Sequence, residues 1–216
     1  MNIAIIGAGK VGGALGSGWA RAGHRVVFGV REPAAEKTRA LLAGLGATAT
    51  AVPVGAAAGA AEVVVLATPW AGTEEALAAA GDLGGKVLID CTNPLRFTPG
   101  TGLELALGFS DSGGECVARW SPGARVVKAF NTYGWENFAD PAYPNAAALR
   151  PVMFLAGDDV AAKGAVGALA GELGFEPFDA GDLRAARELE PLGLLWIRRA
   201  LSGARSPHFT WARLTR

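Results

Sequence analysis

The sequence predicts an α/β fold, a doubly wound parallel sheet with a small C-terminal α/β extension. Three observations predict it. A short apolar run at residues 2–6 leads into a glycine-rich turn and then a helical stretch. Further apolar runs alternate with helical stretches along the chain, as in successive βαβ units. Several runs end in polar or aromatic turns, which fits ligand binding at the carboxyl ends of parallel strands.

The glycine turn has the pattern of a dinucleotide-binding site. It reads Gly7, Ala8, Gly9, Lys10, Val11 and Gly12. Gly7 allows a tight turn after the strand, Gly9 lets backbone approach a pyrophosphate, and Gly12 lets the helix pack closely on the strand. Free N–H groups and the helix dipole at such a helix N-terminus favour negative charge. The pattern predicts a Rossmann dinucleotide-binding domain, against the alternative of a glycine-rich turn in another α/β fold.

The second apolar run, at residues 25–29, is followed two residues later by Arg31. An NAD site usually has a carboxylate near this position, which binds the ribose 2′-hydroxyl. Arginine instead binds phosphate bidentately, so Arg31 favours NADP, with Lys37 as a second candidate for the 2′-phosphate. Two alternatives stay open: Glu32 could still contact a ribose, and Arg31 could be a solvated charge at a strand end.

The other elements of the main sheet follow from their hydrophobic patterns. Continuous apolar runs predict strands that are buried on both faces. We expect strands at residues 2–6, 25–29, 48–52, 62–67, 86–90 and 124–130. The stretch after the glycine turn is the first expected helix, and later helices are expected at about 33–43, 73–80 and 114–120.

Three further turns lie at the carboxyl ends of these strands. They contain Thr68, Pro69 and Trp70, then Asn93 and Pro94, and then Asn131 and Thr132. Since the first turn takes the pyrophosphate, we expect the other three to line the path of the nicotinamide ring and its acceptor. Each has a structural alternative: the prolines could end strands, Asn93 could cap a turn, and Trp70 could belong to the core.

The composition changes at residues 140–150, where prolines predict a loop or linker. We therefore expect an NADP-binding Rossmann domain at residues 1–150 and a small extension at 151–216. Within the extension we expect a strand at 151–156, a helix at about 160–173, a strand at 176–179 and a long helix at 183–201. This last helix is apolar around more than one face, so we expect it to pack on the sheet or on a second subunit.

Composition limits the possible classes of function. The chain has 216 residues, of which 50% are hydrophobic and 19% charged, and its formal net charge is zero. A packed core is expected, and nothing in the charge indicates nucleic-acid binding or electrostatic membrane attachment. No apolar run approaches the ~18 residues of a membrane-spanning helix, and no signal-peptide pattern is visible, so we expect a cytoplasmic location. The two cysteines lack CxxC spacing and no metal-ligand motif is visible, so no metal site is predicted.

Several short motifs occur in order and together carry a resemblance. Besides the glycine turn with Arg31, they are Thr68-Pro69-Trp70, Asn93-Pro94-Leu95, Lys128-Ala129-Phe130-Asn131-Thr132, Ala156-Gly157-Asp158-Asp159, and the stretches 179–183 and 186–192. Over nearly its whole length, the chain resembles the NADP oxidoreductases that depend on the deazaflavin coenzyme F420. It is also similar to the NADPH-binding cytosolic domain of the STEAP metalloreductases.

The resemblance implies a Rossmann domain with a small C-terminal extension, usually a homodimer, and hydride transfer between NADPH and a flavin-like ring such as F420, FMN or FAD. It assigns residues 68–70 to the surroundings of the nicotinamide. Family members commonly carry Ser or Thr and then Arg on the 2′-phosphate, whereas here Val30 precedes Arg31. The deazaflavin reductases carry His-Thr or His-Asn where this chain has Asn131-Thr132. That pair is closer to the metalloreductase pattern and leaves the acceptor open.

We expect direct hydride transfer between NADPH and a second redox-active ring, a small-molecule acceptor. Such a transfer needs stacked rings and excluded water rather than a strong acid or base. His24, in the turn before the second strand, is expected to be structural. One alternative is NADPH-dependent reduction of a C=N or C=O bond in a small metabolite, with Tyr133, Asp90 or Asp179 as proton donor. An alternative of another class is a non-catalytic NADP-binding sensor or an electron-delivery partner.

Overall fold

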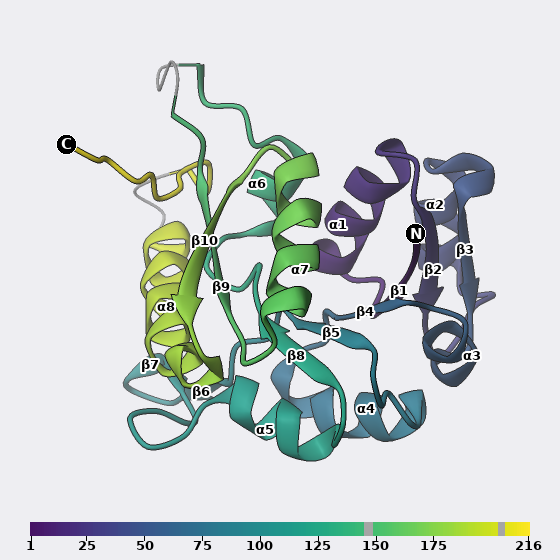
Figure 1. The fold of residues 1–216 in the computed structure, drawn as a ribbon, viewed down its shortest axis with the longest axis horizontal. Coiled ribbons are helices and arrows are strands. Elements are labelled where there is room, and N and C mark those ends of the chain that lie inside the picture. The colour runs from purple at the N-terminus through teal and green to yellow at the C-terminus, as the bar shows by residue number, and fades with distance from the viewer. Residues whose placement is uncertain (145–148, 203–205) are drawn as a thin grey trace.

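The computed structural model describes residues 1–144, 149–202 and 206–216. It contains one large sheet with helices on both faces (Figure 1). The order of the strands in this sheet is β3-β2-β1-β4-β5-β8-β9-β10. Their bounds are β1 Asn2–Ile6, β2 Arg25–Gly29, β3 Ala49–Val52, β4 Val63–Leu66, β5 Val87–Asp90, β8 Arg125–Lys128, β9 Val152–Ala156 and β10 Glu176–Gly181. Every predicted strand is present, so the α/β class is confirmed.

The first six strands of this order run parallel. Their carboxyl ends therefore meet at one edge, where the chain leaves β1 at Gly7 and β4 at Ala67. β1 has neighbours on both sides, β2 and β4. Its residues from Ile3 onward are buried, as are all those of β4. Burial on both faces explains why these strands read as unbroken apolar runs.

The last two strands correct the expectation of a purely parallel sheet. β9 pairs with β8 in the antiparallel direction, with Lys128 opposite Ala156, and β10 pairs with β9 in parallel. The connection from β8 to β9 carries the short helix α6, Trp135–Ala139, and antiparallel neighbours need no crossover helix between them. The extension therefore continues the main sheet. The domain boundary at residue 150 stays a prediction, and residues 145–148 of the expected linker lie outside the described residues.

The other helices divide between the two faces of the sheet, as Figure 1 shows. Their bounds are α1 Lys10–Arg21, α2 Glu36–Ala43, α3 Val54–Gly59, α4 Thr73–Ala80, α5 Gly113–Trp120, α7 Val160–Glu172 and α8 Ala186–Leu201. One core cluster joins α1, α6 and α7 to the strands, and it includes Trp19, Phe138 and Leu169. A second cluster joins α3, α4 and α5 to the other face, around Leu77 and Val117. Two cores on opposite faces show that the sheet is doubly wound.

A β-hairpin between β5 and α5 is not predicted by the sequence pattern. Its strands are β6, Leu95–Thr98, and β7, Gly102–Leu105, which pair in the antiparallel direction. Helices α3 and α6 are also absent from the prediction, because such short segments show little periodicity. Short 3-10 helices lie at Gly46–Thr48, Trp70–Gly72 and Leu183–Ala185, the last of them leading directly into α8.

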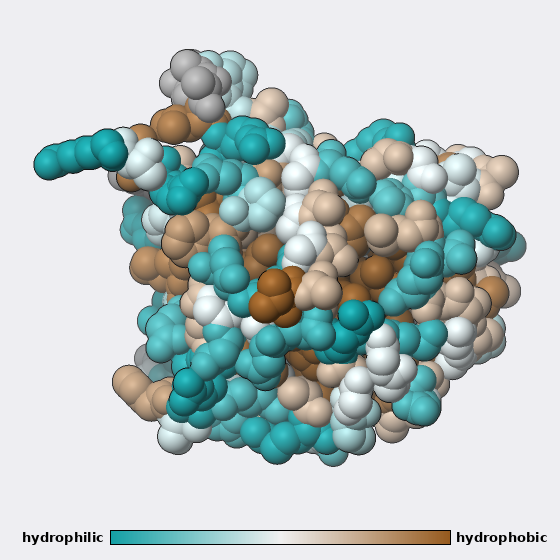
Figure 2. Space-filling model, in the orientation of Figure 1, coloured by the Kyte–Doolittle hydropathy of each residue, from teal (hydrophilic) through white to brown (hydrophobic). Residues whose placement is uncertain are grey.

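The surface carries both hydrophilic and hydrophobic residues. In Figure 2 hydrophilic residues surround most of the visible face and hydrophobic ones concentrate toward its middle. Exposed large hydrophobic side chains include Phe97 on the hairpin, Phe109, and Leu195 and Leu201 on α8. Within residues 1–144, 149–202 and 206–216, no helix has both the length and the apolar character needed to cross a membrane.

Candidate active site

The glycine turn, residues 7–12, joins β1 to α1. Gly7 has a positive φ of 107°, and a Cβ on it would lie 2.6 Å from the Ala67 carbonyl oxygen. A Cβ on Gly12 would lie 2.1 Å from the Gly7 carbonyl oxygen. A Cβ on Gly9, by contrast, would meet no atom of the described residues within 4 Å. Gly7 and Gly12 therefore let the chain pack on itself, whereas Gly9 leaves open space at the start of the helix.

The N-terminus of α1 is suited to an anion. Gly9 is its N-cap residue and gives no side-chain hydrogen bond to the first N–H groups. The first turn carries no acidic residue and begins with Lys10. Uncapped N–H groups and the helix dipole attract negative charge. Residues 7–12, including the half-buried Ala8 and Val11, therefore fit the pyrophosphate of a dinucleotide.

Arg31 follows β2 at the same edge of the sheet. The Gly7 N–H donates to the Gly29 carbonyl oxygen at 3.1 Å, so the glycine turn is tied to the end of β2. The Arg31 side chain is exposed and forms no salt bridge with any residue that the structure describes. Lys37 is exposed as well and lies in the first turn of α2. Both cations are therefore accessible to a phosphate.

The turns after β4, β5 and β8 form what we call the rim, residues 68–70, 93–94 and 131–132. The first of them lies beside the glycine turn, because a Cβ on Gly7 would come within 3.6 Å of the Thr68 methyl group. Pro69 is exposed, and the half-buried Trp70 has its ring 5.3 Å from that of Trp120 on α5. The rim therefore begins next to the glycine turn.

The second and third turns of the rim are joined by reciprocal amide hydrogen bonds. The Asn131 side-chain amide donates to Asn93 Oδ1 at 3.0 Å and to the Leu189 carbonyl oxygen at 3.1 Å. The Asn93 amide donates to the Asn131 carbonyl oxygen at 2.8 Å. Helix α8 packs on this pair so closely that a Cβ on Gly193 would lie 2.7 Å from the Asn131 carbonyl oxygen. Asn131 Oδ1 is buried and has no hydrogen-bond partner among the described residues.

Pro94 and Thr132 are buried, unlike most of the other predicted site residues. A Cβ on Gly113, at the start of α5, would lie 3.2 Å from side-chain atoms of both Pro94 and Trp70. The first and second turns of the rim therefore meet at the N-terminus of α5. Thr132 is 1% exposed, and its hydroxyl has no partner within the described part of the chain. The structure thus brings Trp70, Pro94 and the asparagine pair together, while Thr132 lies in the interior.

A buried ion cluster, Asp90, Lys128 and Glu190, lies against the rim. Asp90 and Lys128 are opposite each other at the ends of β5 and β8, and Glu190 comes from α8. Lys128 Nζ lies 2.9 Å from Asp90 Oδ2, 2.8 Å from Glu190 Oε1 and 2.6 Å from the Thr92 carbonyl oxygen. All three charged residues are at most 1% exposed. Burial lowers the pKa of Lys128, but the two carboxylates outweigh burial and raise that pKa above its ordinary value.

The remaining oxygens of the ion cluster also accept hydrogen bonds. Asp90 Oδ1 accepts from the Thr92 N–H at 2.9 Å and from the Thr92 hydroxyl at 2.7 Å. Glu190 Oε2 accepts from the Gly113 N–H, and its Oε1 accepts from the Gly114 N–H, each at 3.0 Å. Glu190 therefore fixes the N-terminus of α5 beside the rim.

Sequence reasoning misses Lys128, Glu190 and Trp135 as members of this region. One signal was available for the ion cluster, because a charged residue that ends an apolar strand, such as Lys128, needs a buried partner. Trp135 follows the rim in sequence and contacts the glycine turn. Lys10 Nζ lies 5.5 Å from the centroid of its ring, a cation–π contact.

The three residues named as proton donors for the alternative reduction of a C=O or C=N bond are all bonded within the protein. Asp90 is fully buried and bonded within the ion cluster. Tyr133 is 4% exposed and donates its hydroxyl to the Val152 carbonyl oxygen, and burial raises its pKa. Asp179, on the edge strand β10, is held by Lys163 Nζ at 2.7 and 2.8 Å. Each of the three is therefore committed to a contact within the protein.

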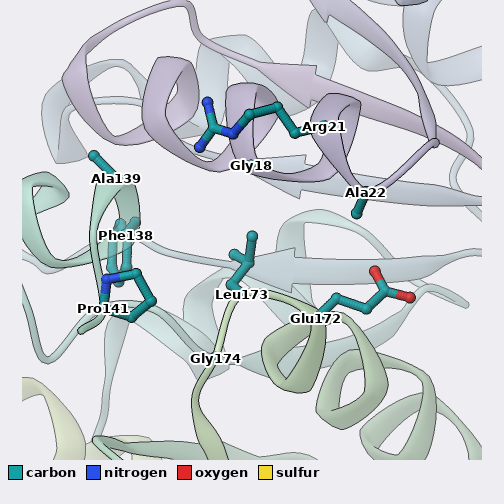
Figure 3. Close-up of a pocket in the computed structure, with 9 residues that line it drawn as sticks. All are labelled: Gly18, Arg21, Ala22, Phe138, Ala139, Pro141, Glu172, Leu173 and Gly174. Atoms are coloured by element: carbon teal, nitrogen blue, oxygen red, sulfur yellow. The ribbon is translucent and has the colours of Figure 1, made fainter.

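A pocket of about 400 Å³ opens at the other end of α1 (Figure 3). Arg21 of α1 and Glu172 of α7 lie on opposite sides of it, and Phe138 of α6 also lines it. Glu172 binds His24 at 2.7 Å, and His24 is 8% exposed, which confirms the structural role expected for this histidine. None of the predicted site residues lines this pocket, so it is separate from the site at the glycine turn.

Comparison with known proteins relates this geometry to a family. The sequence profile of the family described as "NADP oxidoreductase coenzyme F420-dependent" matches residues 2–94. A crystal structure from Arthrobacter sp. FB24, named as a candidate F420-dependent NADP reductase, is 35% identical, with a TM-score of 0.88. The match covers 99% of this chain and 100% of that one. The likeness therefore extends over the C-terminal extension as well.

Two further proteins are either more distant in sequence or much longer than this chain. Rat metalloreductase STEAP3 is 32% identical over 197 residues, which are 90% of this chain and 37% of STEAP3. This chain therefore spans well under half of that relative. A reductive aminase from Aspergillus terreus, solved with NADPH and ethyl levulinate, is 21% identical with a TM-score of 0.65. The match covers 94% of this chain and 62% of the aminase, and at this identity it shows a shared fold.

Proposed function

The chain belongs to the family of coenzyme F420-dependent NADP oxidoreductases, and on that premise we propose that it transfers a hydride between NADPH and a flavin-like ring, either a deazaflavin such as F420 or a flavin. The observation that carries the proposal is that the glycine turn and the rim lie next to each other at one edge of the sheet. When bound, NADPH supplies a hydride from its nicotinamide ring. The chain's own residues bind and orient the two rings and exclude water between them.

The donor half of the site is built from the glycine turn and the two accessible cations. Residues 7–12 hold the pyrophosphate, and Arg31 and Lys37 hold the 2′-phosphate. The rim then holds the nicotinamide. Asn131 Oδ1 suits the carboxamide of that ring, because a buried acceptor without a partner gains a full hydrogen bond from an amide N–H.

A flavin-like acceptor is favoured over a carbonyl or imine because of the chemistry available near the rim. Reduction of a C=O or C=N bond needs a positioned proton donor. Tyr133 and Asp90, the candidates nearest to the rim in sequence, are buried and already bonded. Trp70 offers the rim a half-buried aromatic surface, which suits contact with a planar ring.

The acceptor is tested by offering one compound at a time to the purified protein with NADPH. Loss of the near-ultraviolet absorbance of NADPH is followed with F420, FMN, FAD, a ferric chelate and a cyclic imine. We expect oxidation with at least one flavin-like ring. Oxidation with the imine alone would contradict the proposal and favour a metabolite reductase. Tight NADPH binding without oxidation by any acceptor would favour the NADP-binding sensor.

The 2′-phosphate contact is tested with Arg31→Ala. Loss of a charge-assisted contact costs about 1.5–3 kcal/mol, so the Kd for NADPH should rise about 10- to 150-fold while that for NADH stays nearly constant. Arg21→Ala is the matched control, because it removes an exposed cation at the other end of α1. Equal losses for NADPH and NADH would show that Arg31 does not read the 2′-phosphate.

We also infer that the protein forms a homodimer through α8 and the neighbouring hairpin. Leu195, Leu201 and Phe97 are 50%, 73% and 76% exposed on these elements, and exposed apolar groups on adjacent elements favour a protein contact. Leu195→Glu should convert a dimer to a monomer in light scattering. Val160→Glu, at a 79% exposed position on α7, is the control. A monomeric wild-type protein would contradict the inference.

A further inference from the structure

We propose that the ion cluster acts as a fixed negative charge that favours the oxidised form of a nicotinamide bound at the rim. The inference rests on the proposed function, because it requires NADP(H) with its ring at Trp70 and Pro94. It goes beyond that function by assigning the direction of hydride transfer to a buried group that touches neither ring.

The hydrogen bonds determine the charge of the cluster. Lys128 Nζ contacts three acceptors, namely Asp90 Oδ2, Glu190 Oε1 and the Thr92 carbonyl oxygen, so it uses all three protons of an ammonium group. Each carboxylate oxygen of Asp90 and Glu190 accepts from at least one N–H or O–H group. Hydrogen bonds donated to a carboxylate and a neighbouring ammonium group both favour its ionised form. The cluster therefore holds two negative charges and one positive charge.

The groups around the cluster cancel only part of this net negative charge. The N–H groups at the start of α5 donate to Glu190, and a helix N-terminus carries about half a positive charge. Cys91 and Cys116 are nearby thiols. Burial raises the pKa of both, so they stay neutral and add no charge. A negative remainder is therefore enclosed in the protein, where salt screens it much less than at the surface.

The cluster is separated from the rim by a single residue. A Cβ on Gly113 would lie 3.0 Å from Glu190 Oε1 and 3.2 Å from atoms of Pro94 and Trp70. In hydride donation the C4–H bond of NADPH breaks, its electron pair and hydrogen nucleus move together to the flavin-like acceptor, and the nicotinamide ring gains one positive charge. A preorganised negative charge beside that ring stabilises the cation and so favours transfer away from NADPH.

The test compares the affinities for the two oxidation states of the cofactor. The Kd for NADPH is measured from its fluorescence, and that for NADP⁺ by calorimetry, on the full chain. Glu190→Gln and Asp90→Asn each remove one negative charge from the cluster. Glu188→Gln is the matched control, because it makes the same change on an exposed position of the same helix. For charges about 8–12 Å apart at an effective dielectric of about 20–40, Coulomb's law corresponds to a factor of about 3 to 30.

We expect Glu190→Gln and Asp90→Asn to weaken NADP⁺ binding relative to NADPH binding by about that factor, and Glu188→Gln to leave the ratio unchanged. If both nucleotides bind but all three variants keep the wild-type ratio, the cluster has only a structural role and the proposal is overturned. If wild-type protein binds neither nucleotide, the proposed function itself fails. If both cluster variants fail to fold, the wild-type ratio decides: binding of NADP⁺ at least as tight as that of NADPH supports the proposal, and weaker binding overturns it.

Discussion

Two glycines of the same turn should respond to alanine in different ways. In Gly12→Ala the new methyl group would lie 2.1 Å from the Gly7 carbonyl oxygen and 3.0 Å from the Ile5 side chain. Since protein Cβ contacts rarely fall below 3.0 Å, the turn must shift by about 0.9 Å, which in a packed region costs about 1–3 kcal/mol. In Gly9→Ala the new methyl group meets no atom within 4 Å in the described part of the chain.

The assay therefore separates stability from cofactor binding. Urea unfolding without nucleotide should show Gly12→Ala destabilised by about 1–3 kcal/mol. Gly9→Ala should lose at most about 1 kcal/mol, the difference between glycine and alanine at an N-cap. NADPH affinity should fall strongly in both variants. In Gly9→Ala the cause is direct, because the methyl group occupies the space in front of α1 that fits the pyrophosphate.

One result would refute this reasoning. If Gly9→Ala binds NADPH as tightly as the wild-type protein, the pyrophosphate does not lie against the N-terminus of α1. A Gly12→Ala protein with unchanged stability would instead show that the turn relaxes without cost. The close approach of a Cβ at residue 12 to the Gly7 carbonyl oxygen would then not account for the glycine at this position.

Three other predictions concern the phosphate site, α8 and acid stability. Val30→Thr should tighten NADPH binding about 2- to 10-fold, by adding a hydroxyl worth about 0.5–1.5 kcal/mol, with NADH as the comparison. Gly193→Ala should lower the free energy of unfolding by about 1–3 kcal/mol, because its Cβ would lie 2.7 Å from the Asn131 carbonyl oxygen. Hydrogen bonds from Arg187 hold the pKa of Glu115 below its ordinary value. The stability that these hydrogen bonds give is fully present above about pH 4.3, the pKa of a glutamate in the unfolded chain. It is lost as the pH falls through the lower pKa that Glu115 has in the folded protein. Glu115→Gln should flatten that part of an acid-unfolding curve.

Much of the fold could be predicted because its signals are local. The glycine turn fixes the first strand-helix unit, and short unbroken apolar runs such as 63–67 are typical of strands buried on both faces. The direction of β9 could not be predicted. An apolar run at 151–156 looks the same in either direction, and only its pairing of Ala156 with Lys128 shows that it runs antiparallel to β8.

The candidate site likewise has parts that could be predicted from the sequence and parts that could not. Arg31 and residues 7–12 are close in sequence and form a known spacing, so their positions could be predicted. The ion cluster joins Asp90, Lys128 and Glu190, which are far apart in sequence. No local pattern links them, because the contact depends on where α8 crosses the sheet.

The way α8 reaches across the sheet has a consequence for biosynthesis. Glu190 bonds the backbone of Gly113 and Gly114, 77 and 76 residues earlier in the chain, and Asn131 bonds Leu189, 58 residues away. Such distant contacts cannot form while the ribosome is still translating the segment before α8. The six parallel strands emerge first, but the rim gains its last supports only when residues 186–196 leave the exit tunnel. A nascent chain should therefore form its glycine turn before α8 completes the support of the rim.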